Sequence, residues 1–214
     1  MKTRITTLIL IFVAGLLFAQ ENNQDEIKTL FSKGAKIRGF GAFDMKISPV
    51  NDYNTLLIGG HGGIILNNNF MFGGGGYGMS TTNRFDGIDP AQVLYIYGGY
   101  GGIILGYALS PKEIVHVNFQ ALVGGGGFEI SDTKDLRDIR DQNQLTLDHR
   151  IEYSSAFVIE PGIEAEINVT KFFRLGLGGS YRIVQGVTLD KNNITDSDLS
   201  NWVAQVSFKF GKFW

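Results

Sequence analysis

Strict alternation of apolar and polar side chains near the carboxyl end is the feature that most limits what this chain can fold into. The apolar set is Trp202, Ala204, Val206, Phe208 and Phe210, and the polar set is Asn201, Gln205, Ser207 and Lys209. Successive side chains of a β-strand point to opposite faces, so the stretch predicts a strand with one apolar and one polar face. Val203 is an apolar exception on the polar face. Lipid against one face and a polar lumen against the other would suit such a strand.

The amino terminus predicts export. Lys2 and Arg4 precede an apolar stretch over residues 5–18, and Ala19 stands where cleavage of a signal peptide is expected. The apolar stretch is too short for a spanning helix, and the polar residues 21–26 follow it. We therefore predict a signal peptide over residues 1–20, a short periplasmic or plug segment over 21–34, and one β-barrel domain over 35–214.

Composition excludes some classes of function and leaves others open. A formal net charge of −2 argues against nucleic-acid binding, which needs a basic stripe. The absence of cysteine excludes a lipidation site, a disulfide framework and a thiolate metal site. The mean hydropathy of +0.03 fits a soluble protein and equally a barrel with a lipid face and a polar lumen.

Eight stretches have the period of two that is typical of strands, and their connections alternate in length. The stretches are 36–47, 53–66, 70–80, 93–107, 113–130, 154–168, 172–185 and 200–214. The connections 67–69, 108–112 and 169–171 are short, whereas 48–52, 81–92, 131–153 and 186–199 are generally longer and more polar. This pattern predicts an all-β, antiparallel, up-and-down transmembrane barrel of about eight strands, with short periplasmic turns and longer extracellular loops.

Charged residues share one face of the predicted strands, with Lys212 as the exception near the interface. Lys36, Arg38, Asp44 and Lys46 are all even-numbered, and the same holds for the charged residues of the sixth and seventh strands. An unpaired Lys or Arg on a lipid face near the midplane costs roughly 2–4 kcal/mol, so a membrane barrel must sort its charges in this way. A soluble sandwich or lipocalin-like barrel also alternates, with the faces reversed. The export signal, the alternating connections and the terminal aromatic residue favour the membrane barrel.

The inward faces gather a set of residues that predicts a polar network in the lumen. Its members are Glu160, Glu164, Glu166, Arg174, Arg182, His61, His116 and Lys209. A turn centred near Thr170 would place Glu166 opposite Arg174 across a hairpin. We interpret the set as ion pairs that fill a narrow lumen. A gated conduction path, a proton relay and a catalytic carboxylate pair are the alternatives.

Glycine runs lie inside the predicted strands, where glycine is normally rare. We interpret them as space for His61, Tyr77, Tyr100 or Phe128 in a sharply curved wall, with a small-ligand cavity as the alternative. The three histidines are too scattered to predict a metal site. His149 and Ser154 are the nearest pair for a lipid hydrolase, which is the less favoured reading.

Two motifs resemble a known group. Both resemble uncharacterised outer-membrane proteins of the Bacteroidota. The first motif is Phe18-Ala19-Gln20. The second is Glu160-Pro161-Gly162, followed by residues 174–178 and Ser180-Tyr181-Arg182. The architecture over 35–214 resembles the small eight-stranded barrels of the OmpA membrane-domain and OmpX type. In this sequence Lys212 and Trp214 depart from the usual terminal pattern of that group.

The resemblance implies a place in the outer membrane of a Gram-negative bacterium, among its lipids and lipopolysaccharide. It also implies assembly by the barrel-assembly machinery, with Phe208, Phe210 and Trp214 as the signal. We expect a non-enzymatic barrel with an ion-paired lumen and exposed loops for structural or surface-interaction roles, without cofactor, and take a monomer as the working hypothesis. A narrow pore or a small-ligand carrier is the alternative.

Overall fold

The computed structural model describes residues 36–50, 53–80, 83–86, 93–132, 150–189 and 193–213. Contacts divide the chain into Met1–Gly34 and Ala35–Trp214, and every described residue belongs to the second unit. The predicted signal peptide and the segment 21–34 lie outside the described residues, so both stay predictions.

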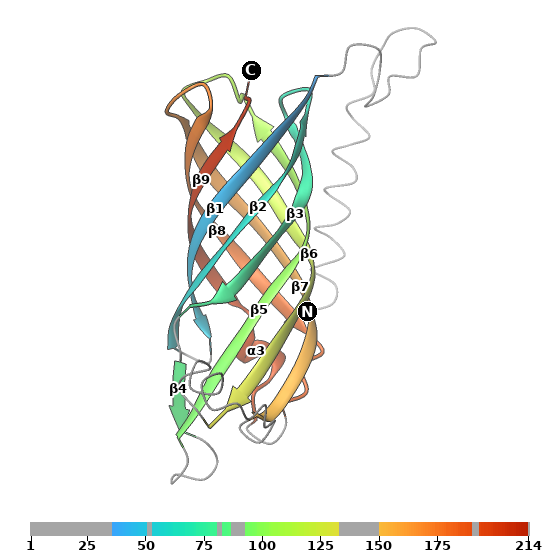
Figure 1. The fold of residues 1–214 in the computed structure, drawn as a ribbon, viewed down its shortest axis with the longest axis vertical. Helices are drawn as coiled ribbons and strands as arrows, with labels where there is room; N and C mark the ends of the chain where they lie inside the picture. The colour runs from blue at the N-terminus through green and yellow to red at the C-terminus, as the bar shows by residue number, and fades with distance from the viewer. Residues whose placement is uncertain are drawn as a thin grey trace, which may run out of the picture. The chain divides into compact units, whose positions relative to one another are not determined.

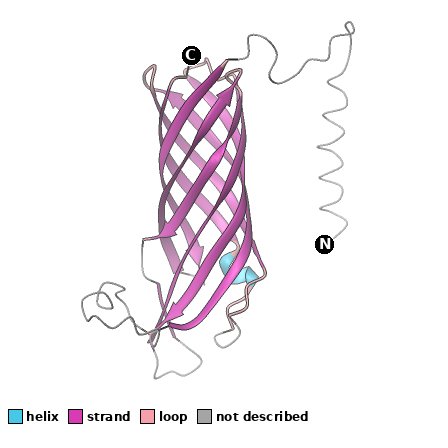
Figure 2. Ribbon diagram, turned by 45° about the vertical axis from the view of Figure 1, so that its right-hand side comes forward, coloured by secondary structure: helices cyan, strands magenta, loops and turns pink. Residues whose placement is uncertain are grey.

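The described residues form one closed antiparallel sheet (Figures 1 and 2). Each strand pairs with its neighbours in sequence except that β3 pairs with β5 instead of β4, and β1 pairs with β9, which closes the barrel. The short strand β4 and strand β3 both pair with β5, so together they occupy one strand position. The barrel is therefore eight-stranded although nine strands are assigned. The strands are β1 Ile37–Val50, β2 Tyr53–Leu66, β3 Phe70–Met79, β4 Asn83–Asp86, β5 Val93–Leu109, β6 Val115–Ser131, β7 Arg150–Asn168, β8 Phe173–Gln185 and β9 Asn201–Gly211, and the helix is α3 Asp196–Leu199.

The closing seam joins β1 to β9, the alternating strand near the carboxyl end. Phe40 pairs with Gly211 and Ile47 pairs with Ala204, in an unbroken antiparallel register between β1 and β9. Every strand edge over this part of the wall is therefore paired, which satisfies the backbone groups without water.

Connections of different length lie at opposite ends of the barrel. Residues 67–69, 110–114 and 169–172 form tight turns at the end that also holds the close of β9, uppermost in Figure 1; we call this the turn end. The other connections lie at the opposite end, the loop end. The prediction of a longer connection over 48–52 is wrong, because Val50 still pairs with Tyr53 and only residues 51 and 52 separate the two strands.

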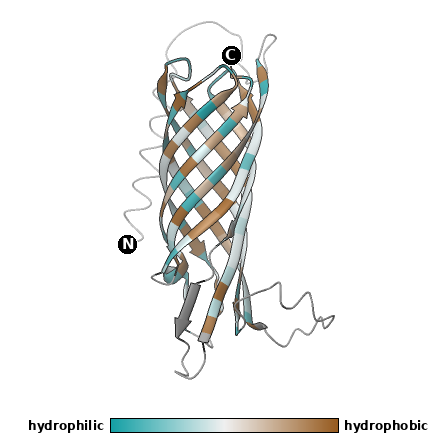
Figure 3. Cartoon of the chain, turned by 60° about the vertical axis from the view of Figure 1, so that its left-hand side comes forward, coloured by the Kyte–Doolittle hydropathy of each residue, from teal (hydrophilic) through white to brown (hydrophobic). Residues whose placement is uncertain are grey.

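The two faces of the wall are sorted as the parity of charged residues predicted. Trp202 is 71% exposed and Leu177 is 56% exposed, whereas Lys209 is 1% exposed. Apolar and polar residues alternate along the strands (Figure 3). Charges inside and large apolar side chains outside are the reverse of a soluble barrel, and they suit a lipid surround. Over the described ranges, no helix combines the length and the apolar character needed to cross a membrane.

The register between β7 and β8 differs from the prediction by two residues. Asn168 pairs with Arg174, and Glu166 pairs with Gly176. Five residues, 169–173, separate the paired residues Asn168 and Arg174, so the pairing is centred on Lys171 rather than on Thr170. An even shift keeps every side chain on its predicted face, so Glu166 and Arg174 are diagonal neighbours on the inner face.

An arginine placed on the outer face tests the lipid exposure of the wall. We expect Leu177→Arg to lower the free energy of unfolding in phospholipid vesicles by roughly 2–4 kcal/mol, because Leu177 lies near the middle of β8. Phe172→Arg, in the adjoining turn, is the depth control and is expected to cost about 0–1 kcal/mol. Urea titration measures both, and equal losses at the two positions would contradict a lipid-facing wall.

Candidate functional site: the lumen

Eight charged side chains are buried inside the barrel, and none is more than 4% exposed. Four are acidic and four are basic, so the formal charges balance. They are Asp44, Glu160, Glu164, Glu166, Lys46, Arg174, Arg182 and Lys209. Burying an ionised group is unfavourable unless it is paired and hydrogen-bonded, so the arrangement of these groups decides whether the interior is stable.

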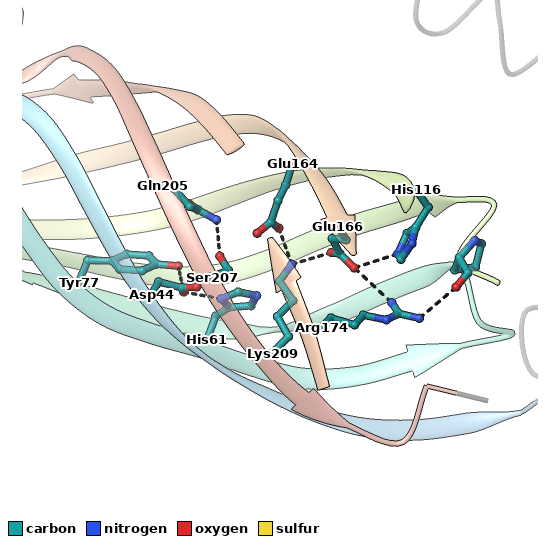
Figure 4. Close-up of polar contacts among 11 residues, drawn as sticks. Asp44, His61, Tyr77, His116, Glu164, Glu166, Arg174, Gln205, Ser207 and Lys209 are labelled. Atoms are coloured by element: carbon teal, nitrogen blue, oxygen red, sulfur yellow. Dashed lines mark hydrogen bonds and ion pairs between the residues drawn. The ribbon is translucent and has the colours of Figure 1, made fainter. Parts of the chain in front are cut away.

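The first group of contacts surrounds Lys209, near the turn end (Figure 4). Its ammonium donates to Glu164 Oε2 at 2.5 Å and to Glu166 Oε1 at 2.7 Å. The other oxygen of Glu166 accepts from Arg174 Nη1 at 3.2 Å and lies 3.0 Å from His116 Nε2. Glu166, on β7, thus contacts residues of β6, β8 and β9 and ties four strands together through one carboxylate.

The second group surrounds Glu160. Its Oε1 accepts from Lys46 Nζ at 2.6 Å and from Ser180 Oγ at 2.8 Å, and its Oε2 accepts a short hydrogen bond from the Tyr100 hydroxyl. The Lys46 ammonium also lies 3.4 Å from the centre of the Tyr77 ring. Salt bridge and cation–π contact together replace the water that this ammonium loses on burial.

Asp44 forms a third group between the other two. Its Oδ2 accepts from the Tyr77 hydroxyl at 2.9 Å and lies 2.6 Å from His61 Nδ1. On the next strand of the seam, Gln205 donates to Ser207 at 2.9 Å. Figure 4 shows the Asp44 group and the Lys209 group following one another along the inside of the barrel.

Most of these contacts join residues that the sequence had placed on the inner face without pairing them. All eight residues predicted for the lumen network lie in the lumen, and each makes at least one buried hydrogen bond or ion pair there. Asp44, Lys46, Tyr77 and Tyr100 belong to the same network although none was predicted as a member. The parity of Asp44 and Lys46 was the signal that identified their face.

The loop end is filled by the connection that precedes β9. Leu189, Ile194 and Leu199 are buried in an apolar cluster inside the barrel mouth; we call residues 187–199 the cap, of which 187–189 and 193–199 are described. The strand residues of this cluster include Val50, Leu57, Leu94, Ile96, Phe128, Ile130, Val158 and Val184. The sequence had predicted a longer, polar extracellular loop over 186–199 and did not indicate that these three apolar side chains enter the barrel.

Arg182 holds the cap in place. Its Nε donates to the carbonyl oxygen of Leu199 at 2.9 Å, and its Nη2 donates to Ser48 Oγ at 3.2 Å. Val187 N also donates to Asp196 Oδ1 at 2.8 Å, which folds the cap upon itself. One buried guanidinium therefore ties the last turn of the cap to both β8 and β1.

The turn end is closed by a smaller contact. Phe213 packs with Ile65 and Met71, and the guanidinium of Arg174 lies 4.0 Å from the centre of the Phe213 ring. Arg174 Nη2 also donates to the carbonyl oxygen of Pro111 at 3.2 Å. Buried side chains are therefore packed at both ends of the lumen and between them.

Strand glycines provide the space for this filling. A Cβ at Gly75 would lie 2.7 Å from His61 Cβ, and a Cβ at Gly98 would lie 2.6 Å from Phe128 Cδ1. Both distances are shorter than a carbon–carbon contact allows. The interpretation of the glycine runs as space for lumen side chains is confirmed at these positions.

The remaining predicted residues lie apart from the lumen or outside the described ranges. Phe210 is exposed on the outer face and Phe208 is partly exposed there, whereas Trp214 is not described. Ser154 is buried and hydrogen-bonded to Thr188, and its suggested partner His149 is not described. Among the described residues, no group of three or more His, Asp or Glu has the arrangement of a metal site.

Known structures share this fold. Neisserial surface protein A is 11% identical over 85% of this chain and 100% of its own, with a TM-score of 0.53. The N-terminal β-barrel domain of Pseudomonas aeruginosa OprF gives 11% identity over 80% and 96%, with a TM-score of 0.48. The outer membrane protein OprG of the same species gives 11% identity over 83% and 94%, with a TM-score of 0.41.

Of these similarities, only that to Neisserial surface protein A, with its TM-score of 0.53, supports an argument about this chain. At 11% identity it establishes the fold alone. No protein-family model matches the chain, and no curated protein matches its sequence. The chain is a closed, all-antiparallel, eight-stranded up-and-down β-barrel, which is the architecture of small outer-membrane barrel proteins.

Removal of Lys209 tests the contribution of the ion pairs to stability. We expect Lys209→Met to lower the free energy of unfolding by roughly 3–5 kcal/mol, because Glu164 and Glu166 lose a buried cation. Adding Glu164→Gln should recover part of that loss, because it removes the carboxylate left without its ion pair. Urea titration of the folded barrel measures both, and a single variant as stable as the parent would show that the pairs contribute little.

A methyl group at Gly176 tests the close packing of the same cluster. The Cβ of Gly176→Ala would overlap the carboxylate of Glu164, so we expect a loss of about 1–3 kcal/mol in the free energy of unfolding. Gly78→Ala is the matched control, because a Cβ there meets nothing within 4 Å. Similar effects of the two substitutions on the urea midpoint would contradict a tightly filled lumen.

Proposed function

We propose that this chain is a non-enzymatic outer-membrane barrel of a Gram-negative bacterium, with a closed lumen and a structural or surface-interaction role. The observation that carries the proposal is the filled interior. Paired charges occupy the middle of the lumen, the cap fills one mouth, and Phe213 closes the other. Such a barrel is a rigid support for the segments at its loop end.

The route to the membrane is part of the same proposal. Residues 1–20 act as the export signal, and the terminal aromatic residues Phe208, Phe210 and Trp214 are recognised by the barrel-assembly machinery. The apolar outer face supports insertion as a monomer among lipid and lipopolysaccharide, with the turn end toward the periplasm. The Phe18-Ala19-Gln20 motif suggests a source among the Bacteroidota.

A narrow pore is the second candidate, and one set of atoms favours it. Both side-chain atoms of Asn118, Gln120 Oε1 and His61 Nε2 are buried without a hydrogen-bond partner in the structure. Buried polar atoms usually bind a partner or ordered water, so these atoms favour some hydration between the charged groups. The filled mouths oppose a continuous water path, and a carrier of small ligands would meet the same obstacle.

Conductance in a planar lipid bilayer separates the closed barrel from the pore. We expect no single-channel steps at any voltage for the parent chain, and none for Arg182→Ala, because loosening the cap leaves the Lys46–Glu160 group beneath it. Steps from the parent would refute the closed lumen. Steps from Arg182→Ala alone would assign closure to the cap rather than to the ion pairs.

Two controls accompany this measurement. A folded barrel migrates differently on a gel before and after boiling, and identical migration with partition to the soluble fraction would refute membrane insertion. His149→Ala and Ser154→Ala are expected to leave the lipid profile of the membrane unchanged. An altered profile would favour the lipid hydrolase.

A further inference from the structure

The turn end carries a ring of exposed positive charge. Its bases come from the start of β1, from two of the three tight turns and from the chain beyond β9, so they are spread around the barrel. They are Lys36, Lys112, Lys171 and Lys212, all exposed, and we call this set the basic rim. Glu113 is the one acidic residue that the described turns of this end contain.

Exposed apolar side chains lie directly beside these bases. In the same turns Ile114 is 73% exposed and Phe172 is 61% exposed, and the rings of Phe70 and Tyr107 pack edge to face at 4.8 Å on the neighbouring outer face. Apolar tips on tight turns are unfavourable in water but are stable at the boundary between hydrocarbon and headgroups. A lysine at that depth extends its apolar stem along the wall and places its ammonium among the headgroups.

The loop end has the opposite charge. Its connecting segments 51–52, 81–92, 132–149 and 186–200 hold more acidic than basic residues. The acids are Asp52, Asp86, Asp89, Asp132, Asp135, Asp138, Asp141, Asp148, Asp190, Asp196 and Asp198, and the bases are Arg84, Lys134, Arg137, Arg140 and Lys191. The sequence therefore has its excess of basic residues in the described turns and its excess of acidic residues in the other connections, while the charges of the lumen balance.

We propose that the basic rim binds the headgroups of anionic glycerophospholipids in the leaflet at the turn end. The proposal rests on the proposed function, since it requires the barrel to span a bilayer. The bases lie at one end of the barrel beside exposed apolar side chains, and they come from the start of β1, two different turns and the residue after β9. A compact soluble anion would meet only one or two of them at a time. Attraction of this kind weakens as salt shortens the range of electrostatic interaction.

The rim also explains an otherwise costly choice of residues. The closed sheet does not require lysine at its turn tips, and the lumen already has its own balanced set of bases. Anionic headgroups would neutralise the rim and fix the depth of the barrel in the bilayer, with the acidic loop end kept away from the phospholipid leaflet. The rim then acts as a depth and orientation anchor.

The test compares a neutral rim with a rim that keeps its charge. The neutral variant combines Lys36→Gln, Lys112→Gln, Lys171→Gln and Lys212→Gln, and the matched control changes the same four residues to Arg. All four side chains are exposed, so both variants should fold and show the heat-dependent gel migration of the parent. Glu113→Gln, which raises the charge of the rim, is a third variant with an effect of opposite sign.

The readout is the relative association of spin-labelled phosphatidylglycerol and phosphatidylcholine with the reconstituted barrel. We expect the parent and the arginine variant to prefer phosphatidylglycerol about fivefold at low salt, and the preference to approach one at high salt. The neutral variant should show almost none, and Glu113→Gln should exceed the parent. A parent without preference, or a neutral variant that keeps it, would overturn the proposal. Failure of the parent to insert, seen as identical migration before and after boiling, would refute the proposed function itself.

Discussion

Neutralisation of charge inside the barrel is the interaction on which the rest of the structure depends. A wall of eight strands leaves an interior only wide enough for side chains, and this interior holds four acids and four bases with almost no exposed surface. Each carboxylate that carries a salt bridge accepts from a base on another strand, so the contacts that make burial tolerable also tie the strands together. Because the charged side chains find their partners inside the barrel, the outer face can consist of apolar side chains.

The two ends of the lumen are closed mainly by apolar and aromatic packing, whereas the lumen between them is filled by ion pairs. The loop end uses apolar packing, in which Leu189, Ile194 and Leu199 enter the barrel and Arg182 binds the backbone behind them. The turn end uses Phe213 and the guanidinium of Arg174. Arg174 and Arg182 thus make contacts both in the polar interior and at the ends of the lumen. This arrangement favours the proposed closed structural barrel over the pore.

Much of the fold was predictable because a period of two is local. The parity of Asp44 and Lys46, or of Glu164 and Glu166, fixes a face without knowledge of the neighbouring strand. The partners on that face were not predictable. Lys46 meets Glu160 across 114 residues, through the register and stagger of the whole barrel. A hairpin centred on Lys171 rather than on Thr170 places Glu166 diagonal to Arg174 instead of opposite it. The cap was missed because three separated apolar residues in an acidic segment have no period, and their burial depends on the finished mouth.

Site-specific labelling along β9 tests the inverted, closed barrel most directly, because the chain has no cysteine of its own. Single cysteines at 204, 206 and 208 carry a bimane, and quenching by brominated lipid is measured; single cysteines at 203, 205 and 207 are exposed to a charged methanethiosulfonate reagent. The structure predicts strong lipid quenching at the even positions and no reaction at the odd positions until the barrel is unfolded. Rapid reaction at the odd positions would contradict the closed lumen, and absence of lipid quenching at the even positions would contradict the membrane barrel.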